Sequence, residues 1–283
     1  MHGLSPQEIA SARALMASLG LSPRKAWGQH FLISPGVLDS IVQAAQLSPG
    51  DLVVEVGPGL GILTEVLTRQ GARVVAVEID PGLVTALRAR FQELPSVQIL
   101  QGDARQIEPL EVTGGKLYKV VANLPYYAAS PIVRRFLEGS HRPSLMVVTV
   151  QREVAQNMAA APPRMNLMGL GVQFYGHPKI VRYINAGSFY PPPKVTSAVV
   201  RIEVYPEPPW KIADVPRFFS LLRGGFSAPR KQLKGALSRA LGLPAPSMAE
   251  VLLRAGIDPT RRAETLGLPE WANLYRVWLE QHE

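Results

Sequence analysis

The chain has 283 residues, 47% of them hydrophobic, so it can bury the core of one large domain and a smaller one. Thirty Lys and Arg against 22 Asp and Glu give a net charge of +8, which favours polyanionic partners, although solubility alone would also account for the charge. No cysteine is present, which excludes disulfides, thiolate metal sites, iron–sulfur clusters and cysteine nucleophiles.

Metal and membrane functions are not indicated either. The five histidines are scattered without the spacing of metal ligands, so we expect no catalytic metal. No apolar run approaches the ~20 residues of a membrane span, and the N-terminus lacks the pattern of a signal peptide. We therefore expect a cytoplasmic protein with no membrane partner, and we expect it to be a monomer.

The N-terminal region predicts two helices separated by a loop. Ser5 as N-cap and Pro6 at the first helical position start a helix to about Leu19. The loop over residues 23–32 either lies over a ligand or plugs the core with its aromatic residues, and the second interpretation is favoured. Ser34 then starts a second helix, which runs to about Gln46.

From residue 52 onward, short β-branched runs alternate with amphipathic helices, which is typical of βαβ units in a mainly parallel sheet. The expected strands of this pattern are 52–56, 73–77, 97–100, 117–122 and 145–150, with helices from Leu60, Pro81 and Ser130. Two further strands, 180–184 and 197–204, are expected to pair antiparallel at the sheet edge. Because parallel sheets bind ligands at the carboxyl ends of their strands, the site is expected there.

A proline-rich break at 206–209 is followed by a sequence that predicts helices only. The expected helices are 215–223, 230–241, 248–255 and 269–281. We therefore predict two domains, an α/β domain over 1–206 and a small all-α domain over 207–283.

A glycine-rich turn follows the first strand, where Gly57, Gly59 and Gly61 allow close approach of the backbone to a ligand. A dinucleotide is the first candidate for that ligand. However, the dinucleotide fingerprint expects Gly or Ala where this chain has Ile62, and it does not usually place an acid such as Glu55 two residues before the first glycine.

Polar residues end the successive strands and indicate a different cofactor. Glu78 would accept hydrogen bonds from both hydroxyls of a ribose, Asp103 from an adenine amino group, and Glu55 would lie near a cationic, amine-bearing end. The glycine turn carries no Lys or Arg to meet a phosphate. These properties fit S-adenosylmethionine, although each acid taken singly would also fit a solvated strand end.

The segment Asn123-Leu124-Pro125-Tyr126, directly after the fourth strand, has the groups needed to hold a planar amine. The Asn123 oxygen can accept one amine hydrogen, and the carbonyl of Leu124 or Pro125 the other. Tyr126 can stack on one face of the ring, with Phe189 on the other. Taken alone, the segment would also fit an ordinary turn, and Phe189 a core aromatic.

These residues resemble the rRNA adenine N6,N6-dimethyltransferases, most closely the bacterial small-subunit (16S) branch, over nearly the whole chain. The segments that carry the resemblance are 28–32, 55–61, 78–80, 102–104, 123–126, 151–155, 189–195, Phe226-Ser227 and Arg230-Lys231. The resemblance implies a class I Rossmann-like methyltransferase fold with a seven-stranded sheet. It also implies dimethylation of two adjacent adenosines in the 3′-terminal hairpin loop of small-subunit rRNA during ribosome biogenesis.

Together with the resemblance, the residues predict a site that takes S-adenosylmethionine as cofactor and releases S-adenosylhomocysteine as product. The expected catalytic residues are Asn123, Leu124, Pro125, Tyr126 and Phe189. The expected cofactor-binding residues are Gln29, His30, Leu32, Glu55, Gly57, Gly59, Gly61, Glu78, Ile79, Gly102, Asp103, Ala104 and Asn123. The expected RNA-binding residues are Arg223, Arg230, Lys231 and Lys234, the last three on one side of a helix.

Two departures from the family pattern stand out. His30 takes the place of a frequent Asn, and Gly169-Leu170-Gly171 lies where an Arg-Leu-Ser-like segment is expected. Three alternative functions stay open: a macrolide-resistance type dimethylase acting on large-subunit rRNA, a ribosome-assembly factor that needs no turnover, and a DNA adenine methylase. The 151–155 segment and the long helical C-terminal region argue against the first, the intact acids and Asn123 against the second, and Leu-Pro-Tyr instead of Pro-Pro-Tyr/Phe against the third.

Overall fold

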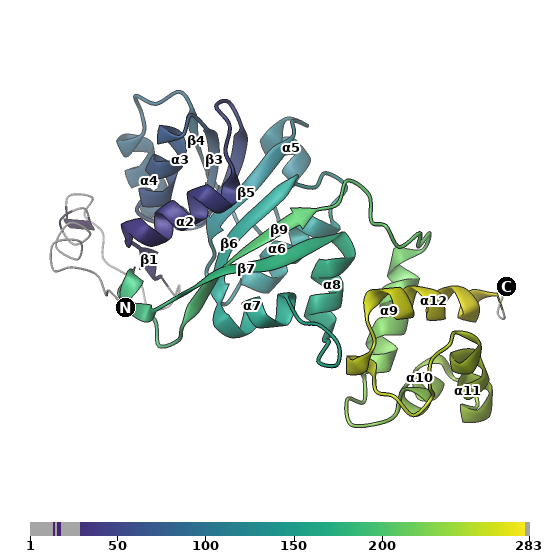
Figure 1. Ribbon diagram of the computed structural model, residues 1–283. Coiled ribbons are helices and arrows are strands. Elements are labelled where there is room, and N and C mark those ends of the chain that lie inside the picture. Colours follow the sequence, from purple (N-terminus) through teal and green to yellow (C-terminus); the bar gives the residue numbers. More distant parts are fainter. Residues whose placement is uncertain (1–13, 15, 18–28, 281–283) are drawn as a thin grey trace. The chain divides into compact units, whose positions relative to one another are not determined.

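The computed structural model describes residues 14, 16, 17 and 29–280, and the first predicted helix falls largely outside them. The chain divides into two compact units (Figure 1). One comprises the described residues up to Gln156 with His177–Pro206, and the other comprises Asn157–Gly176 with the described residues from Glu207. The expected domain limits, 1–206 and 207–283, differ from these units in the segment 157–176, and as domain limits they stay a prediction.

The first unit is built on a seven-stranded sheet with the order β4-β3-β2-β5-β6-β9-β7. Its strands are β2 (Leu52–Val56), β3 (Arg73–Glu78), β4 (Val97–Gln101), β5 (Tyr118–Asn123), β6 (Leu145–Gln151), β7 (Gly176–Ile184) and β9 (Ser197–Val204). Strands β4, β3, β2, β5 and β6 are parallel to one another, whereas β9 is antiparallel to β6. The expected mainly parallel sheet is confirmed, with β7 at its edge.

Two strands extend one residue further than expected and end on polar residues of the predicted site. Glu78 is the last residue of β3, and Asn123 is the last residue of β5. Both therefore start from the rigid carboxyl edge of the sheet rather than from a loop. The backbone of the sheet thus fixes where their side chains begin.

Helices cover this sheet, and Figure 1 shows α3 and α4 beside β3 and β4. Helix α2 packs on β5, β6 and β9 through the buried residues Val37, Leu38, Ile41 and Ala45. The helices of the first unit are α2 (Pro35–Ala45), α3 (Ile62–Arg69), α4 (Pro81–Arg90), α5 (Pro109–Thr113) and α6 (Ala129–Glu138), followed by α7 (Arg152–Met158), which extends into the second unit. Within the described chain, every helix is too short or too polar to traverse a lipid bilayer.

A two-stranded ribbon, β1 (Phe31–Leu32) with β8 (Phe189–Tyr190), was not predicted. Two-residue strands are too short to show the alternation by which a strand is recognised. Phe31 is buried in the core, as the favoured interpretation of the N-terminal loop expected for it, whereas Trp27, the other aromatic of that interpretation, lies outside the described residues. Phe31 also lines a cavity together with Gln29 and His30, which is the other interpretation of the loop. The ribbon pairs residues 157 and 159 positions apart in sequence and fixes the backbone that precedes it.

The second unit is helical: α8 (Leu167–Tyr175), α9 (Val215–Phe226), α10 (Leu233–Leu241), α11 (Ala245–Arg254) and α12 (Leu268–Leu279). The expected start of α10 at Arg230 is wrong, because Gln232 is its N-cap and the N–H of Lys231 instead closes a turn onto the Ala228 carbonyl. Gly169-Leu170-Gly171 lies in α8, where Asn166 caps the helix by accepting from the Gly169 N–H at 2.8 Å.

Candidate active site

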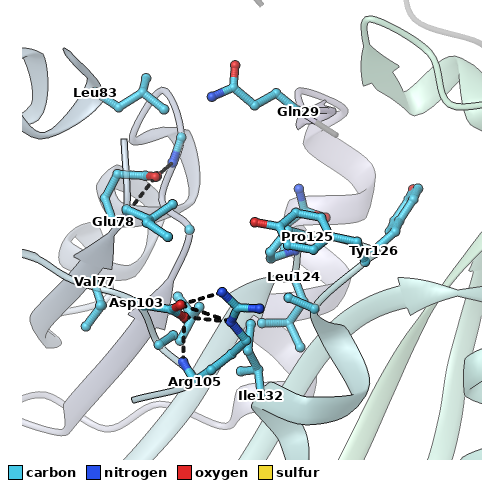
Figure 2. Close-up of a pocket in the computed structure, with 18 of the residues that line it drawn as sticks. Gln29, Val77, Glu78, Leu83, Asp103, Arg105, Leu124, Pro125, Tyr126 and Ile132 are labelled. Atoms are coloured by element: carbon cyan, nitrogen blue, oxygen red, sulfur yellow. Dashed lines mark hydrogen bonds and ion pairs between the residues drawn. The ribbon is translucent and has the colours of Figure 1, made fainter. Parts of the chain in front are cut away.

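A cavity opens at the carboxyl ends of β2, β3, β4 and β5 in the first unit. Figure 2 shows its two walls: Glu78 and Leu83 face Leu124, Pro125 and Tyr126 across the cavity. The expected residues that line it are Gln29, His30, Gly57, Gly59, Glu78, Ile79, Gly102, Asp103, Ala104, Asn123, Leu124, Pro125 and Tyr126. The folded chain therefore brings most of the expected site together.

The glycine turn after β2 forms part of the floor. Gly59 has a φ of +58°, and a Cβ on it would lie 2.8 Å from the Phe31 ring. Only glycine combines this backbone conformation with such a close approach. The turn also contacts the neighbouring strand β3, because the Gly59 N–H donates to Glu78 Oε2 at 3.4 Å.

Glu78 is held by the backbone around it and is only 5% exposed. Its Oε1 accepts from the N–H groups of Ile79 at 2.9 Å and Asp80 at 3.0 Å. Burial raises the pKa of the Glu78 carboxyl, and these backbone donors partly oppose the rise. The carboxyl is thus a rigid acceptor that lines the cavity.

Asp103 is covered by a cation that the sequence reasoning had not considered. Arg105 lies two residues further along and donates through Nε to both Asp103 carboxylate oxygens at 3.0 Å (Figure 2). This pairing is the main reason that the pKa of Asp103 is lowered. The Arg105 side chain is 45% exposed, so the pair stands at the mouth of the cavity.

The Asn123 side chain has one end hydrogen-bonded and the other end without a partner among the described residues. Its Nδ2 donates to the His30 carbonyl at 3.0 Å. Because a carbonyl oxygen only accepts, this bond fixes the orientation of the amide. Asn123 Oδ1 is then buried without a hydrogen-bond partner among the described residues. A buried acceptor without a partner is costly in a folded protein, so it needs an explanation such as a ligand.

Backbone bonds fix the turn that follows Asn123. The Leu124 N–H donates to the Thr149 carbonyl of β6 at 3.1 Å, and the Pro125 carbonyl accepts from the Ala128 N–H at 3.0 Å. The second bond uses the Pro125 carbonyl inside the protein. Of the two carbonyls considered for the amine, Leu124 is therefore the better candidate.

Tyr126 and His30 form a stacked pair on the cavity wall, with ring centroids 5.6 Å apart and an interplanar angle of 28°. The Tyr126 hydroxyl lies 2.5 Å from Ser197 Oγ, and burial raises the pKa of the phenol. His30 Nδ1 lies 2.8 Å from the Pro191 carbonyl, so this nitrogen carries a proton and donates. The stack is thereby anchored on both sides.

Four expected site residues lie in the interior instead of on the cavity wall: Leu32, Glu55, Gly61 and Phe189. Glu55 is 1% exposed and accepts from Thr64 Oγ1 of α3 at 2.6 Å. Because side chains alternate along a strand, Val56 faces the cavity and Glu55 faces α3. Burial raises the pKa of Glu55 to about 8, so it is neutral at pH 7.

The other three residues serve packing. Leu32 and Phe189 are register partners in the β1–β8 ribbon, and both belong to the buried core. A Cβ on Gly61 would lie 2.7 Å from the Phe91 ring, so this glycine allows α3 and α4 to approach. The structure therefore does not place Phe189 against a base in the cavity.

Several lining residues were missed by the sequence reasoning: Phe31, Val56, Val77, Leu83, Arg105, Tyr127, Ala128 and Ile132. Leu83 and Ile132 come from α4 and α6, where an apolar residue facing a cavity has the same pattern as one facing a core. Arg105 and Tyr127 did give a signal, since each directly follows an expected site segment. Tyr127 is 57% exposed and stands at the cavity mouth with Arg105.

The expected RNA-binding residues belong to the second unit. Arg223 lies in the last turn of α9, and Lys234 lies in the first turn of α10. Arg223, Arg230 and Lys231 are exposed, whereas Lys234 is half-buried. The predicted placement of Arg230, Lys231 and Lys234 along one side of a single helix is therefore wrong, because Arg230 and Lys231 precede α10.

Residues 20–277 match the family "Ribosomal RNA adenine dimethylase". The chain belongs to this family. A "Ribosomal RNA small subunit methyltransferase A" from Dehalococcoides mccartyi is 47% identical over 277 residues, covering 98% of this chain and 95% of the relative. A protein of the same name from Pelotomaculum thermopropionicum is 40% identical over 284 residues, covering 96% of each.

Solved structures agree with the expected fold of this dimethylase family. A dimethyladenosine transferase from Plasmodium falciparum has a TM-score of 0.78 and 24% identity, covering 89% of this chain and 98% of its own. The 23S rRNA methyltransferase ErmE has a TM-score of 0.71 and 25% identity, covering 87% and 98%. The predicted class I Rossmann-like methyltransferase fold and the predicted family are confirmed.

Proposed function

We propose that this dimethylase transfers methyl groups to N6 of two adjacent adenosines in the 3′-terminal hairpin loop of small-subunit (16S) rRNA during ribosome biogenesis. The observation that carries the proposal is Asn123 Oδ1, a buried acceptor without a described partner in the cavity wall. The choice of rRNA is supported by relatives that bear a small-subunit name at 40 to 47% identity. A cytoplasmic location follows from that substrate.

The cavity fits S-adenosylmethionine by its donor set. Glu78 offers carboxylate oxygens suited to ribose hydroxyls, and the apolar walls formed by Val77, Ile79 and Leu83 suit a purine. Asp103 lines the same cavity, and its carboxylate would accept from an adenine amino group in competition with Arg105, which binds both of its oxygens in the structure described. When bound, the cofactor supplies an activated methyl group and becomes S-adenosylhomocysteine. We propose that no metal takes part.

Catalysis by these residues depends on geometry. The adenine amine is a poor nucleophile because its lone pair is delocalised into the ring. If Asn123 Oδ1 and the Leu124 carbonyl accept the two N6 hydrogens, the nitrogen is held with its lone pair directed at the methyl group. Asn123 is suited to this role because the His30 carbonyl fixes its amide before the substrate arrives. The protein therefore needs no strong base at this position.

The target base must leave its stack to reach the cavity, at a cost of a few kcal/mol that is smaller in a loop. Tyr126 offers a face for this base, and its stack with His30 and its contact with Ser197 keep the ring in place. The structure supports Tyr126 in this role but not the interior residue Phe189. The exposed Tyr127 is a second aromatic at the entrance.

Residues of the second unit are proposed to bind the phosphate backbone of the rRNA. Arg223, Arg230 and Lys231 are exposed, and the half-buried Lys234 lies close in sequence. Cations that neutralise phosphates make affinity fall with salt. We expect the affinity for RNA to fall steeply with salt concentration in the wild type, and less steeply in Lys231→Ala.

The test is to incubate the protein with methyl-labelled S-adenosylmethionine and, separately, unmodified small and large ribosomal particles, and then to map the labelled nucleosides by mass spectrometry. We expect N6,N6-dimethyladenosine at two adjacent positions near the 3′ end of small-subunit rRNA. Label confined to the large particle would instead establish the large-subunit alternative. Binding without any methylation of either particle would establish the non-catalytic assembly factor.

A further inference from the structure

The edge strand β7 carries an exposed row of side chains that the proposed mechanism does not use. His177, Lys179, Val181 and Tyr183 alternate along the strand and are all exposed. Tyr183 is 48% exposed and Val181 39%, although both types of side chain are usually more buried. These residues share one face, because side chains of a strand repeat every two residues. We call them, together with Arg152, the edge stripe.

The opposite face of β7 is occupied by the protein itself. Arg182 donates to the Gly36 carbonyl and to Ser40 Oγ of α2, both at 2.7 Å. The buried Ile184 points the same way by alternation. The edge stripe therefore faces away from α2.

Arg152 completes the edge stripe from a different element. It is the first residue of α7, and its guanidinium carbon lies 5.1 Å from the centroid of the Tyr183 ring. An aromatic ring beside a guanidinium gives two flat surfaces, on either of which a nucleobase can stack. Lys179 adds a flexible cation on the same face of β7, four residues before Tyr183. The exposed Glu153 is the nearest acid in sequence, next to Arg152.

Short contacts link the edge stripe to the cavity wall within the same unit. The Arg152 N–H donates to the Thr196 carbonyl at 2.9 Å, and the next residue, Ser197, contacts the Tyr126 hydroxyl at 2.5 Å. Tyr126 in turn lines the cavity. Arg152 of the edge stripe and Tyr126 of the cavity wall are therefore both held by residues 196 and 197, at the start of β9.

We propose that the edge stripe binds the single-stranded RNA adjoining the target adenosine, with a base stacked on Tyr183 or Arg152 and a phosphate near Lys179. This inference rests on the proposed function, because it names a further contact of the same substrate. Exposed aromatics between cations are the combination by which proteins hold unpaired RNA. A protein strand adding to the edge of β7 is the competing occupant, but it would not require the aromatic ring or the cations.

The experiment compares Tyr183→Ala, Tyr183→Phe and Lys179→Ala with the control Leu117→Ala. Leu117 is 76% exposed in the same unit, just before the amino end of β5 and hence at the other end of the sheet strands from the cavity. The probe is unmodified small-subunit rRNA transcribed in vitro, titrated at several salt concentrations. Calorimetric titration with S-adenosylmethionine is the second readout.

We expect Tyr183→Ala to weaken RNA binding about tenfold, because one stacking platform is lost. Tyr183→Phe keeps the ring and stays within about twofold of the wild type. Lys179→Ala lowers the slope of log affinity against log salt by about one. Leu117→Ala leaves RNA binding unchanged, and all four variants bind S-adenosylmethionine as the wild type does.

Wild-type RNA affinity in Tyr183→Ala would overturn the inference, as would an equal loss in Tyr183→Phe. A loss seen with intact small particles but not with the free rRNA would also overturn it, in favour of a protein partner at the strand edge. These outcomes are distinct from failure of the proposed function, which would appear as a wild-type protein that methylates neither ribosomal particle.

Discussion

The ends of β2 and β5, two neighbouring parallel strands, use their polar residues in opposite ways. Glu55 of β2 is enclosed, accepts from Thr64 and lies away from the cavity. Asn123 of β5 has its amide nitrogen bound to His30, while its oxygen lies in the cavity region without a described partner. In the sequence, both residues were expected in the site for the same reason, their position at the end of a strand. What separates them is whether the protein itself satisfies the group.

This difference teaches how the site is prepared before any ligand binds. A polar group with all its partners inside the protein stabilises the fold, whereas one that is oriented but unsatisfied is ready to accept from a ligand. Glu78 lies between the two cases. It is held by three backbone donors, yet it faces the cavity.

The largest effect of a substitution is expected at Asn123, where a different result would break the comparison with Glu55. Asn123→Ala removes the preset acceptor, and loss of one such group costs about 10²–10³ in kcat. Cofactor affinity should stay within about threefold, because the remaining wall is unchanged. Steady-state methylation and calorimetric titration measure the two quantities. Loss of cofactor binding in step with kcat would show that Asn123 supports the cavity rather than the reaction.

At Glu78 we expect the effect on binding instead of turnover. Glu78→Gln keeps the shape but weakens the acceptor for ribose hydroxyls, since hydrogen bonds to a charged group are roughly twice as strong as neutral ones. Affinity for S-adenosylmethionine should fall about tenfold, with kcat at saturating cofactor changed by less. Equal cofactor affinity in Glu78→Gln and wild type would place the ribose elsewhere.

At Glu55 the expected effect is on stability and its pH dependence. The folded protein keeps the Glu55 proton up to about pH 8, while the ordinary pKa is 4.5, so folding takes up a proton between these values. Stability from this group is full below about pH 4.5 and is lost as pH rises towards 8, by about 1.4 kcal/mol per pH unit.

Glu55→Gln keeps an acceptor for Thr64 and cannot ionise, so it serves as the matched variant. Relative to wild type, its free energy of unfolding should rise between pH 6 and pH 8 and exceed the wild-type value at pH 9. Denaturant titrations at each pH measure this difference. A constant difference would mean that the wild-type carboxyl is already ionised at pH 6.

The smallest effect is expected at Arg105. Its bonds to Asp103 are at the cavity mouth, where solvent screens them. Arg105→Ala should therefore change the affinity for S-adenosylmethionine by less than about threefold, while the pKa of Asp103 rises because its main stabilising partner is gone. A loss of tenfold or more would show that Arg105 itself holds the cofactor.

The sequence predicted the sheet well, because the β-branched runs such as 52–56 and 73–77 have the same boundaries in the structure to within one residue. It also placed Glu78, Asp103 and Asn123 around one cavity, because parallel strands end at the same edge. The sequence wrongly placed Glu55 in the same cavity. Successive side chains of a strand point to opposite faces, so a shift of one residue decides whether a side chain faces the cavity or the interior.

Other features gave no sequence signal. The β1–β8 ribbon brings Phe31 beside Tyr190 through a long-range pairing that no local pattern encodes. The bond from Asn123 to the His30 carbonyl depends on that same ribbon, because it fixes the backbone next to His30. The prediction that Arg230 and Lys231 lie in a helix was wrong. The helical sequence pattern extends to the N-terminal side of the true N-cap, Gln232, so it did not show where the helix begins.

The most direct test of Asn123 as the acceptor for the adenine amine is a thermodynamic cycle. A short rRNA hairpin with adenosine at the target positions is compared with one that has purine riboside, which lacks the amino group, in wild type and Asn123→Ala. We predict that removing the amino group weakens binding about tenfold in wild type and has little effect in Asn123→Ala. The same ratio in both proteins would contradict the account.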